Sequence, residues 1–404
     1  MNVLHLNTSE AGGGASKIAR QLCEFLHCNG ISSSLLVKKK TSNVTYIHQL
    51  HSKNPFSVIS TKIMSRLFRE MGLEFFPTQQ SKRVQEFLSD DTIIHLHNTH
   101  CNFVDIQFFS KLSHFYPTVI TFHDTWYYTG HCAHHFDCYE WKSGCRTCKY
   151  LKTPPNILRD NASANQRYKL TALSKSNAVL VSPSKWLMSE LEIIPEISHL
   201  RKVLIPNGVD PVTFSSVDPI PFISSINANN KPFVVTCIAT NLDKNPFKYF
   251  SLALESVSEA SKISGLAVSF NCVGCNNESY TEGLLSVNYF PFSSERDLAR
   301  LMLSSDLFVH LAKGETFGLV IVEAMLSGLP VIASDVGGIP DIVVDGFNGY
   351  LVENNVHDVR EKLVTLMTDR NLLRKLATNA KQSARQFSLS SMCDKYLELY
   401  KSFN

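Results

Sequence analysis

An apolar unit at residues 306–334 has the pattern of a strand, a helix and a second strand. Asp306 to Ala312 (DLFVHLA) and Pro330 to Ser334 (PVIAS) are short apolar runs typical of buried parallel strands. Between them, Leu319 to Leu326 is apolar on every side except at Glu323, so we expect a helix that is covered all round. Sheets built from such units are buried on both faces by helices.

Two carboxylates belong to this unit. Glu315 falls in the loop before the helix, and Glu323 falls on the helix itself, where the apolar surroundings carry it into the interior. A buried carboxylate is destabilising unless a partner binds it. The partner is either a backbone amide or an arginine in a purely structural role, or a ligand.

The same alternation of apolar strands and helices occurs twice along the 404 residues, which is too long for one ordinary core. We therefore predict an α/β protein with two doubly wound domains and a cleft between them. The first would cover residues 1–208 and the second residues 209–387, and a C-terminal helix at about 388–404 is expected to pack back on the first. A stretch rich in proline, serine and asparagine at Pro211 to Pro232 is the predicted linker.

The composition narrows the class of protein. With 44% hydrophobic and 19% charged residues, the chain is globular. A net charge of +3 allows an anionic small molecule or a membrane surface as partner and is too weak to indicate nucleic acid. The start MNVLHLNTSEAGGG lacks the features of a secretory signal, and no stretch has the length of a membrane span. We expect a cytoplasmic protein, whose eleven cysteines are reduced thiols or metal ligands.

Two features of the first half indicate a ligand site at the carboxyl ends of its strands. A glycine run, Gly12 to Gly14, separates the first strand from a helix, where backbone amides can face an anion. Its spacing differs from the GxGxxG fingerprint, which disfavours a nicotinamide cofactor. His97 and His123 each follow a buried strand, and Asp124 comes next. Packed histidines and an ordinary glycine turn are the alternatives.

A cysteine-rich loop, TGHCAHHFDCYEWKSGCRTCKY, follows His123. Thiolates at this density can hold a structural zinc ion, and one of the histidines in the loop can replace a thiolate as ligand. Unligated thiols in a packed loop are the alternative. The expected zinc ligands are Cys132, Cys138, Cys145 and Cys148.

Basic residues occur in two places that bear on function. A predicted helix from Phe56 to Met71 has an apolar face with Lys62, Arg66 and Arg69 between the apolar positions. Such a helix rests on anionic lipid or packs on its own domain. In the second half, the segment NLDKNPFKYF places two lysines, 244 and 248, after a strand, where they can neutralise phosphate.

Taken together, these motifs resemble the family-4 glycosyltransferases of the GT-B fold over nearly the whole chain. The resemblance rests on NGVD at residues 207–210, on Lys248, on GETFGLVIVEAM, GLPVIASDVGGIPDIV and DGFNGYLV, and on the glycine loop, His123 and SPSKW. HDTWYYTGHC and the cysteine cluster resemble a subgroup that assembles bacterial exopolysaccharide or O-antigen repeat units. The fold implied is GT-B, with two Rossmann-like domains.

The resemblance implies retaining transfer of a sugar from a nucleotide-diphosphate sugar, of the UDP or GDP type, to a hydroxyl of a saccharide acceptor. No metal takes part in the implied chemistry and no cofactor is needed for catalysis. The acceptor is expected to be linked to polyprenyl diphosphate, which would bring the protein to the inner face of the plasma membrane as a peripheral partner. No nucleic acid is implied.

The resemblance also implies roles for single residues. Glu323 would hold the nucleotide ribose, Glu315 and His123 would lie beside the donor sugar, and Lys248 would bind the diphosphate. Donor contacts are further implied for Gly13 and Gly14, for the amides of Phe317, Gly318 and Leu319, and for Asn207.

One departure concerns the lysine. Relatives carry an arginine shortly before it and a glycine after it, whereas Phe247 and Tyr249 flank Lys248 here, and Lys244 is the candidate to replace the arginine. Two other functions stay open. The first is a GT-B epimerase or phosphorylase, and the second is a catalytically silent protein that binds a sugar nucleotide.

Overall fold

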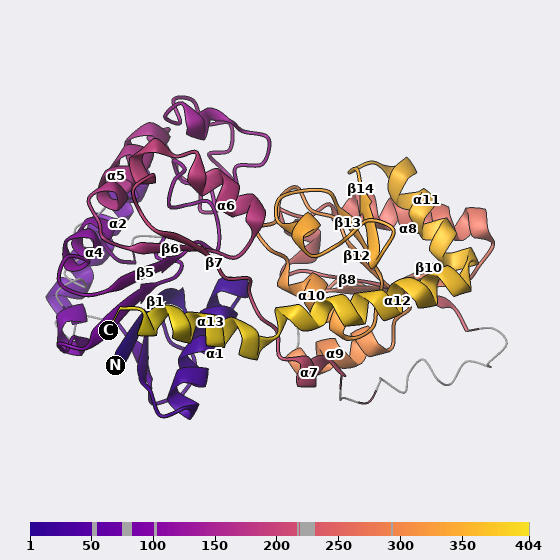
Figure 1. The fold of residues 1–404 in the computed structure, drawn as a ribbon. Helices are drawn as coiled ribbons and strands as arrows, with labels where there is room; N and C mark the ends of the chain where they lie inside the picture. The colour runs from indigo at the N-terminus through magenta and orange to yellow at the C-terminus, as the bar shows by residue number, and fades with distance from the viewer. Residues whose placement is uncertain are drawn as a thin grey trace. The chain divides into compact units, whose positions relative to one another are not determined.

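The structure is a computed structural model that describes residues 1–50, 55–74, 83–100, 103–215, 218, 231–291 and 294–403. The chain forms two compact units (Figure 1). The first consists of Met1–Pro206 with Cys393–Asn404, and the second of Asn207–Met392. Each unit has its own sheet and its own apolar core.

The first unit is a seven-stranded parallel sheet with the order β3-β2-β1-β4-β5-β6-β7. The chain builds outward from β1 in one direction and then crosses to β4 on its other side, so the carboxyl ends of β1 and β4 flank a topological switch point. The strands are β1 (Asn2–Ser9), β2 (Ser32–Lys39), β3 (Ile47–Gln49), β4 (Thr92–Leu96), β5 (Thr118–Thr121), β6 (Val179–Ser182) and β7 (Lys202–Leu204). The helices of this unit's own segments are α1 (Gly14–Cys28), α2 (Pro55–Glu70), α4 (Ile106–Leu112), α5 (Ala162–Ser174) and α6 (Lys185–Glu192).

Helices cover both faces of this sheet because its strands are apolar on both sides. Leu35 and Val37 pack with Ala19 and Cys23 of α1, whereas Leu36 belongs to the larger cluster that also contains residues of α4 and α5. Successive side chains of a strand point to opposite faces, which explains why neighbours in β2 enter different clusters.

The second unit repeats this plan, with the strand order β10-β11-β9-β8-β12-β13-β14 and one antiparallel strand, β10, at the edge. Its switch point lies between β8 and β12. The strands are β8 (Phe233–Ile238), β9 (Val268–Val273), β10 (Tyr280–Glu282), β11 (Leu285–Phe290), β12 (Leu307–His310), β13 (Val331–Ser334) and β14 (Gly349–Val352). The helices are α7 (Pro211–Ser215), α8 (Phe250–Ser264), α9 (Glu295–Leu303), α10 (Leu319–Leu326), α11 (Val356–Thr368) and α12 (Arg370–Ala384).

The predicted unit at residues 306–334 is present as β12, α10 and β13. All residues of α10 from Ile321 to Leu326 are buried, and Glu323 among them is 7% exposed. The prediction of a helix covered all round is therefore confirmed.

The last helix, α13 (Leu389–Lys401), joins the first unit through polar contacts on its sheet. The Tyr400 hydroxyl lies 2.6 Å from Nδ1 of His95, and the Tyr396 hydroxyl lies 2.8 Å from Oγ1 of Thr121. Both tyrosines are fully buried. Because each buried hydroxyl finds a partner on the sheet, the helix has a defined position there.

Two sequence predictions differ from the structure. The predicted linker starts at Pro211, but Pro211–Ser215 form helix α7 and Phe214 is buried in the core of the second unit, so this part of the segment is folded. Most of the remaining linker, at 216–217 and 219–230, lies outside the described residues. The sequence around Gly337 and Gly338 also predicts a glycine turn that opens a helix, but only the 3-10 turn η6 (Ile339–Asp341) follows this turn. None of the helices in the described ranges combines the length and apolar character that crossing a membrane requires.

Candidate active site

The candidate site of the second unit forms where the loops after β8 and β12 meet. The segment before α8 runs alongside the segment after β12: the Tyr249 N–H donates to the Leu311 carbonyl (3.0 Å), and the Lys313 N–H donates to the Phe247 carbonyl (2.9 Å). Lys248 lies between these two bonds and so is held at the carboxyl end of the sheet. This is the switch point, where doubly wound sheets bind ligands.

Lys248, His310 and Glu315 form one hydrogen-bonded group at this point. The Lys248 Nζ lies 2.7 Å from Oε2 of Glu315 and 2.9 Å from Nε2 of His310. Burial and the Lys248 charge lower the pKa of His310 to about 4, so its ring is neutral at pH 7 and Nε2 accepts from the ammonium. The lysine and carboxylate side chains remain 13% and 24% exposed, which leaves the pair accessible to a ligand.

The carboxylate of Glu315 is ionised. Burial alone would raise its pKa, but the Lys248 charge holds the pKa of Glu315 well below its usual range. A carboxylate in this state can stabilise a neighbouring positive charge and cannot donate a proton near pH 7.

A glycine turn holds the backbone of Glu315. The Gly338 N–H donates to the Glu315 carbonyl (2.8 Å), and Gly337 has a φ of 56°, a left-handed conformation that side chains disfavour. A Cβ atom built on Gly337 would lie 2.0 Å from the Glu315 carbonyl oxygen. Only glycine therefore allows this close approach between the two loops.

Helix α10 begins directly after this loop. Gly318 has a φ of 104° and forms the N-cap, so the first free amides of the helix follow Glu315 closely in the chain. Phe317 is 3% exposed and packs edge-on against Phe387, which anchors the helix start. A helix start carries about half a positive charge and is suited to an anion.

The remaining predicted residues of this unit differ in their exposure. Glu323 is buried on α10, whereas Lys244 is exposed in the 3-10 turn η5 (Leu242–Lys244). Asn207 is 5% exposed, and its Oδ1 atom has no hydrogen-bond partner among the described residues. A buried acceptor of this kind is uncommon and is compatible with a ligand donor.

In the first unit, the predicted site residues occupy the carboxyl edge of the sheet. Gly13 is the N-cap of α1 and Gly14 its first residue, and both are exposed. Gly12 and Gly13 have φ values of 95° and 88°, and open space surrounds both. His123 follows β5, next to the end of β4.

His123 ends a chain of histidine rings that runs into the sheet. Its Nε2 lies 2.9 Å from Nδ1 of His97, whose Nε2 lies 3.2 Å from Nδ1 of His5. Burial lowers the pKa of His123 and His5 to about 3, so these rings are neutral at pH 7. His5, His95 and His97 are close enough to hold a metal ion, but nearly every ring nitrogen already has a protein partner. We therefore infer that this row of histidine rings positions His123.

The predicted zinc ligands are only partly brought together. The ligand atoms of Cys132, Cys148 and His131 lie close to one another. The thiols of Cys138 and Cys145 do not belong to this group. All ten cysteines in the described ranges are free thiols.

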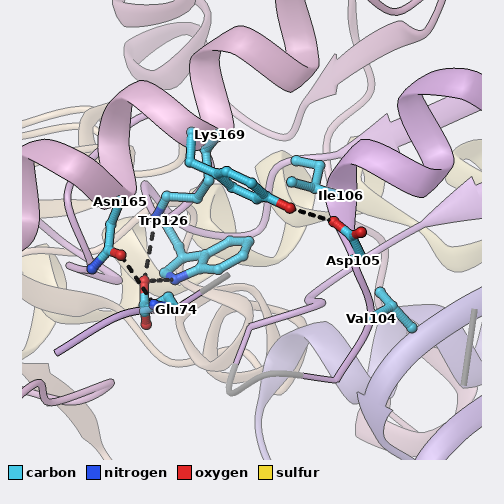
Figure 2. A pocket seen from close by; sticks show the side chains of 8 residues that line it. Glu74, Val104, Asp105, Ile106, Trp126, Asn165 and Lys169 are labelled. Carbon is cyan, nitrogen blue, oxygen red and sulfur yellow. Dashed lines mark hydrogen bonds and ion pairs between the residues drawn. The ribbon is translucent and has the colours of Figure 1, made fainter. Parts of the chain in front are cut away.

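A pocket in the first unit is built from paired groups (Figure 2). The Trp126 Nε1–H donates to Oε2 of Glu74 (2.6 Å), and the Lys169 ammonium lies 3.3 Å from the same oxygen and 4.0 Å from the Trp126 ring centre. Burial raises the pKa of Glu74 and lowers that of Lys169. Because these groups satisfy one another, the pocket fixes the chain after α2 against the HDTWYY segment. We assign it a structural role.

Helix α2 exposes its apolar face. Ile59 and Ile63 are each 56% exposed, and Leu67 is 47% exposed. The interpretation that this helix packs its apolar face on its own domain is wrong for these residues. Phe56 and Lys62, which belong to the same predicted pattern, have side chains outside the described part of the structure.

Sequence reasoning missed His310. It is the last residue of β12, so it lies at the carboxyl end of a strand, as His97 and His123 do in the first unit. The run DLFVHLA by itself predicts only a strand. A polar residue at the carboxyl end of a buried strand was the signal that could have identified it.

Comparisons with known proteins agree with this architecture. Residues 274–383 match the family described as glycosyl transferases group 1. The chain is 21% identical over 419 residues to the putative colanic acid biosynthesis glycosyl transferase WcaC of Escherichia coli K12, and each chain is covered completely. It is 24% identical over 414 residues to an uncharacterized 41.2 kDa protein in the cps region of Klebsiella pneumoniae, again with complete coverage of both. Its fold is similar to that of Anabaena Alr3699/HepE in complex with UDP and glucose, with a TM-score of 0.69, 17% identity and complete coverage of both chains.

The two doubly wound sheets, the group 1 match around Glu315 and Glu323, and the full-length similarities lead to one conclusion. The chain has a GT-B fold, its residues 274–383 match the glycosyl transferases group 1 family, and over its full length it resembles the glycosyltransferases of exopolysaccharide synthesis.

Proposed function

We propose that this protein is a retaining glycosyltransferase of surface polysaccharide synthesis. It transfers a sugar from a nucleotide-diphosphate sugar to a hydroxyl of a lipid-linked saccharide, with no metal ion in the chemistry. The observation that carries the proposal is the contact of Lys248 with Glu315 at the switch point of the second sheet, directly before the start of α10.

The chemistry of the leaving group explains why a lysine is needed at this position. As the bond between the sugar and the diphosphate breaks, negative charge grows on the phosphate oxygens, and groups that bind this charge more strongly than the ground state accelerate the reaction. Lys248 supplies a full charge, and the amides of Gly318 and Leu319 supply a partial one. These donors are fixed by backbone pairing and by the helix, so they need little reorganisation during the reaction.

We assign the carboxylate of Glu315 to the stabilisation of the reacting sugar. Because its pKa is held low, it is negatively charged at neutral pH and can stabilise the positive charge that develops on the anomeric carbon. In a front-face mechanism the departing phosphate oxygen takes the proton of the acceptor hydroxyl, so no protein base is required. We assign His123 to contact with the donor sugar, in the neutral form that burial of its ring favours.

We assign nucleotide recognition to Glu323. Its carboxyl group is carried by the buried helix that also supplies the anion-binding amides, so one rigid element would hold both ribose and phosphate. The donor base is proposed to be of the UDP or GDP type. Support for a uridine nucleotide comes from the similar fold of Alr3699/HepE, whose structure holds UDP and glucose.

Helix α2 supports the proposal that the acceptor is lipid-linked. An exposed apolar row on a helix that also carries Arg66 and Arg69 suits the surface of a membrane with anionic lipids. The similarity to WcaC, named for colanic acid biosynthesis, and to a protein of a cps region points to polysaccharide assembly on such a surface.

The proposed function is tested directly by measuring sugar transfer and the anomeric configuration of the product. The purified chain is incubated with UDP- and GDP-sugars and with lipid-linked saccharides extracted from bacterial membranes, and the product is analysed by NMR. We expect acceptor-dependent transfer in which the donor's configuration is kept. An inverted product would contradict the retaining mechanism, and turnover without an acceptor would indicate an epimerase or phosphorylase instead.

Nucleotide binding tests the Glu323 assignment separately. We expect Glu323→Gln to weaken binding of the nucleoside diphosphate about tenfold or more in calorimetry, because the ribose hydroxyls lose a charged acceptor. Glu361→Gln, on the exposed side of α11, is the matched control and should bind as the wild type does. Equal affinity in Glu323→Gln and wild type would remove the ribose role. Binding without transfer to any acceptor would indicate a silent nucleotide-binding protein.

A further inference from the structure

Three potential metal ligands converge in the loop that follows β5. The ligand atoms of His131, Cys132 and Cys148 all lie within 4.8 Å of one another. The Nε2 of His131 is 3.1 Å from Sγ of Cys148 and 3.8 Å from Sγ of Cys132. A tetrahedral zinc ion with a Zn–N distance of about 2.0 Å and Zn–S distances of about 2.3 Å brings its ligand atoms to within about 3.5–3.8 Å of one another. The observed spacing is close to this arrangement.

The second nitrogen of His131 is already engaged. Its Nδ1 lies 2.7 Å from the carbonyl oxygen of Pro155, which can only accept, so Nδ1 carries a hydrogen and the lone pair of the neutral ring is on Nε2. Ligating histidines characteristically donate their other ring N–H to a carbonyl or carboxylate, which fixes the orientation and the tautomer. His131 therefore presents its free lone pair to the two sulfur atoms.

The backbone on both sides of the group is also fixed. The hydroxyl groups of Thr125 and Thr129 donate to the Cys132 carbonyl, at 3.1 and 2.8 Å. The Cys148 N–H donates to Oδ2 of Asp160 at 2.8 Å. His131 and Cys132 are buried, and Cys148 is partly buried. The three ligands are thus held in place by bonds that do not involve their own ligand atoms.

We propose that His131, Cys132 and Cys148 bind a zinc ion that braces this loop. One nitrogen and two sulfur ligands select zinc over magnesium or calcium, which prefer oxygen. This set differs from the four thiols that the sequence predicts, because His131 takes part and Cys138 and Cys145 do not. The proposal does not rest on the glycosyltransferase function.

The loop has a physical need for such a brace. Between β5 and α5 the only regular element is the three-residue turn η2 (Glu140–Lys142), so the segment cannot gain stability from long helices or strands. The binding free energy of a metal ion that joins residues 131–132 to residue 148 in the folded protein adds to the stability of the loop. The loop starts directly after His123 and Asp124, so its order bears on the position of the candidate sugar contact.

Metal analysis of the whole protein, purified under reducing conditions without a histidine tag and supplied with zinc, tests the proposal. We expect about one tightly held zinc per chain. Cys148→Ser and Cys132→Ser should bind zinc at least about tenfold more weakly, whereas Cys138→Ser should keep it. Retention of zinc by Cys148→Ser, or loss of zinc from Cys138→Ser, would overturn the ligand assignment.

X-ray absorption on the unmutated protein keeps the test valid where a variant fails to fold. The expected spectrum shows at least two sulfur atoms and one imidazole nitrogen around zinc, at about 2.3 and 2.0 Å. Chelation should lower the melting temperature of the wild type in the absence of any nucleotide. A protein without bound zinc, a shell of only nitrogen and oxygen, or a disulfide between Cys132 and Cys148 in the freshly purified protein would refute the zinc site.

Discussion

The Lys248 ammonium lies 2.7 Å from the Glu315 carboxylate, although the two residues are 67 positions apart in the chain. Lys248 follows β8 and Glu315 follows β12, and these strands are neighbours in the sheet. The pairing keeps the carboxylate charged and directs the ammonium to the point where a diphosphate would lie. It therefore links the electrostatics of the free protein to the proposed chemistry.

Loss of the lysine should impair the chemical step. We expect Lys248→Ala to reduce kcat by about 100-fold or more, because the leaving diphosphate loses its fixed cation. Lys262→Ala, an exposed lysine of α8, is the matched control and should retain wild-type turnover. Near-normal kcat in Lys248→Ala would contradict the assignment and move the role to Lys244. Steady-state transfer assays with saturating donor decide between these outcomes.

The contact between the glycine turn and Glu315 allows a test that leaves every charged group in place. Gly337→Ala should displace the Glu315 backbone, because the new Cβ would meet its carbonyl oxygen at 2.0 Å, and we expect kcat to fall about tenfold or more. Gly346→Ala imposes a similar backbone strain, with a φ of 69°, in open space. The measurement is kcat in variants of equal stability. If both variants lose activity equally, backbone strain alone accounts for the effect.

The fold could be predicted from the sequence because its strands and helices have strong periodic patterns. The run from residue 306 to residue 334 predicts a buried helix between parallel strands, and the structure has this unit. The contact between Lys248 and Glu315 could not be derived from periodicity, since it depends on which strands are neighbours in the sheet. The residues of the proposed zinc site could be predicted only in part, because the sequence of an irregular loop has no repeating pattern that indicates which side chains converge.

The buried histidines should make the first unit sensitive to acid. Burial lowers the pKa of His5 and His123 to about 3 and that of His95 and His97 well below its usual value. Below pH 6.5 the unfolded chain takes up protons on these rings and the folded unit does not, so stability is present above this pH and falls as the pH decreases. We expect the free energy of unfolding to drop by about 1 kcal/mol per histidine between pH 7 and pH 5.5.

Tryptophan fluorescence during denaturant unfolding can measure this loss in the first unit alone, because Trp126, Trp141 and Trp186 are the three tryptophans of the chain. His5→Gln should make the dependence on pH less steep, whereas His199→Gln, at an exposed position, should not change it. Equal stability at pH 7 and pH 5.5 would show that these rings are protonated in the folded protein.

The exposed apolar row of α2 should bind a membrane surface. Ile63 and Leu67 are 56% and 47% exposed, and a helix in the interface gains from burying such side chains among lipid chains. We expect the double variant Ile63→Asp with Leu67→Asp to bind vesicles containing anionic lipid at least about tenfold more weakly in flotation assays. Ile193→Asp, which changes an isoleucine that is 55% exposed elsewhere in the same unit, should bind as the wild type does. Transfer to a soluble acceptor should be unchanged in all variants, since α2 carries none of the proposed site residues. Equal flotation of the double variant and the wild type would show that α2 does not contact the membrane.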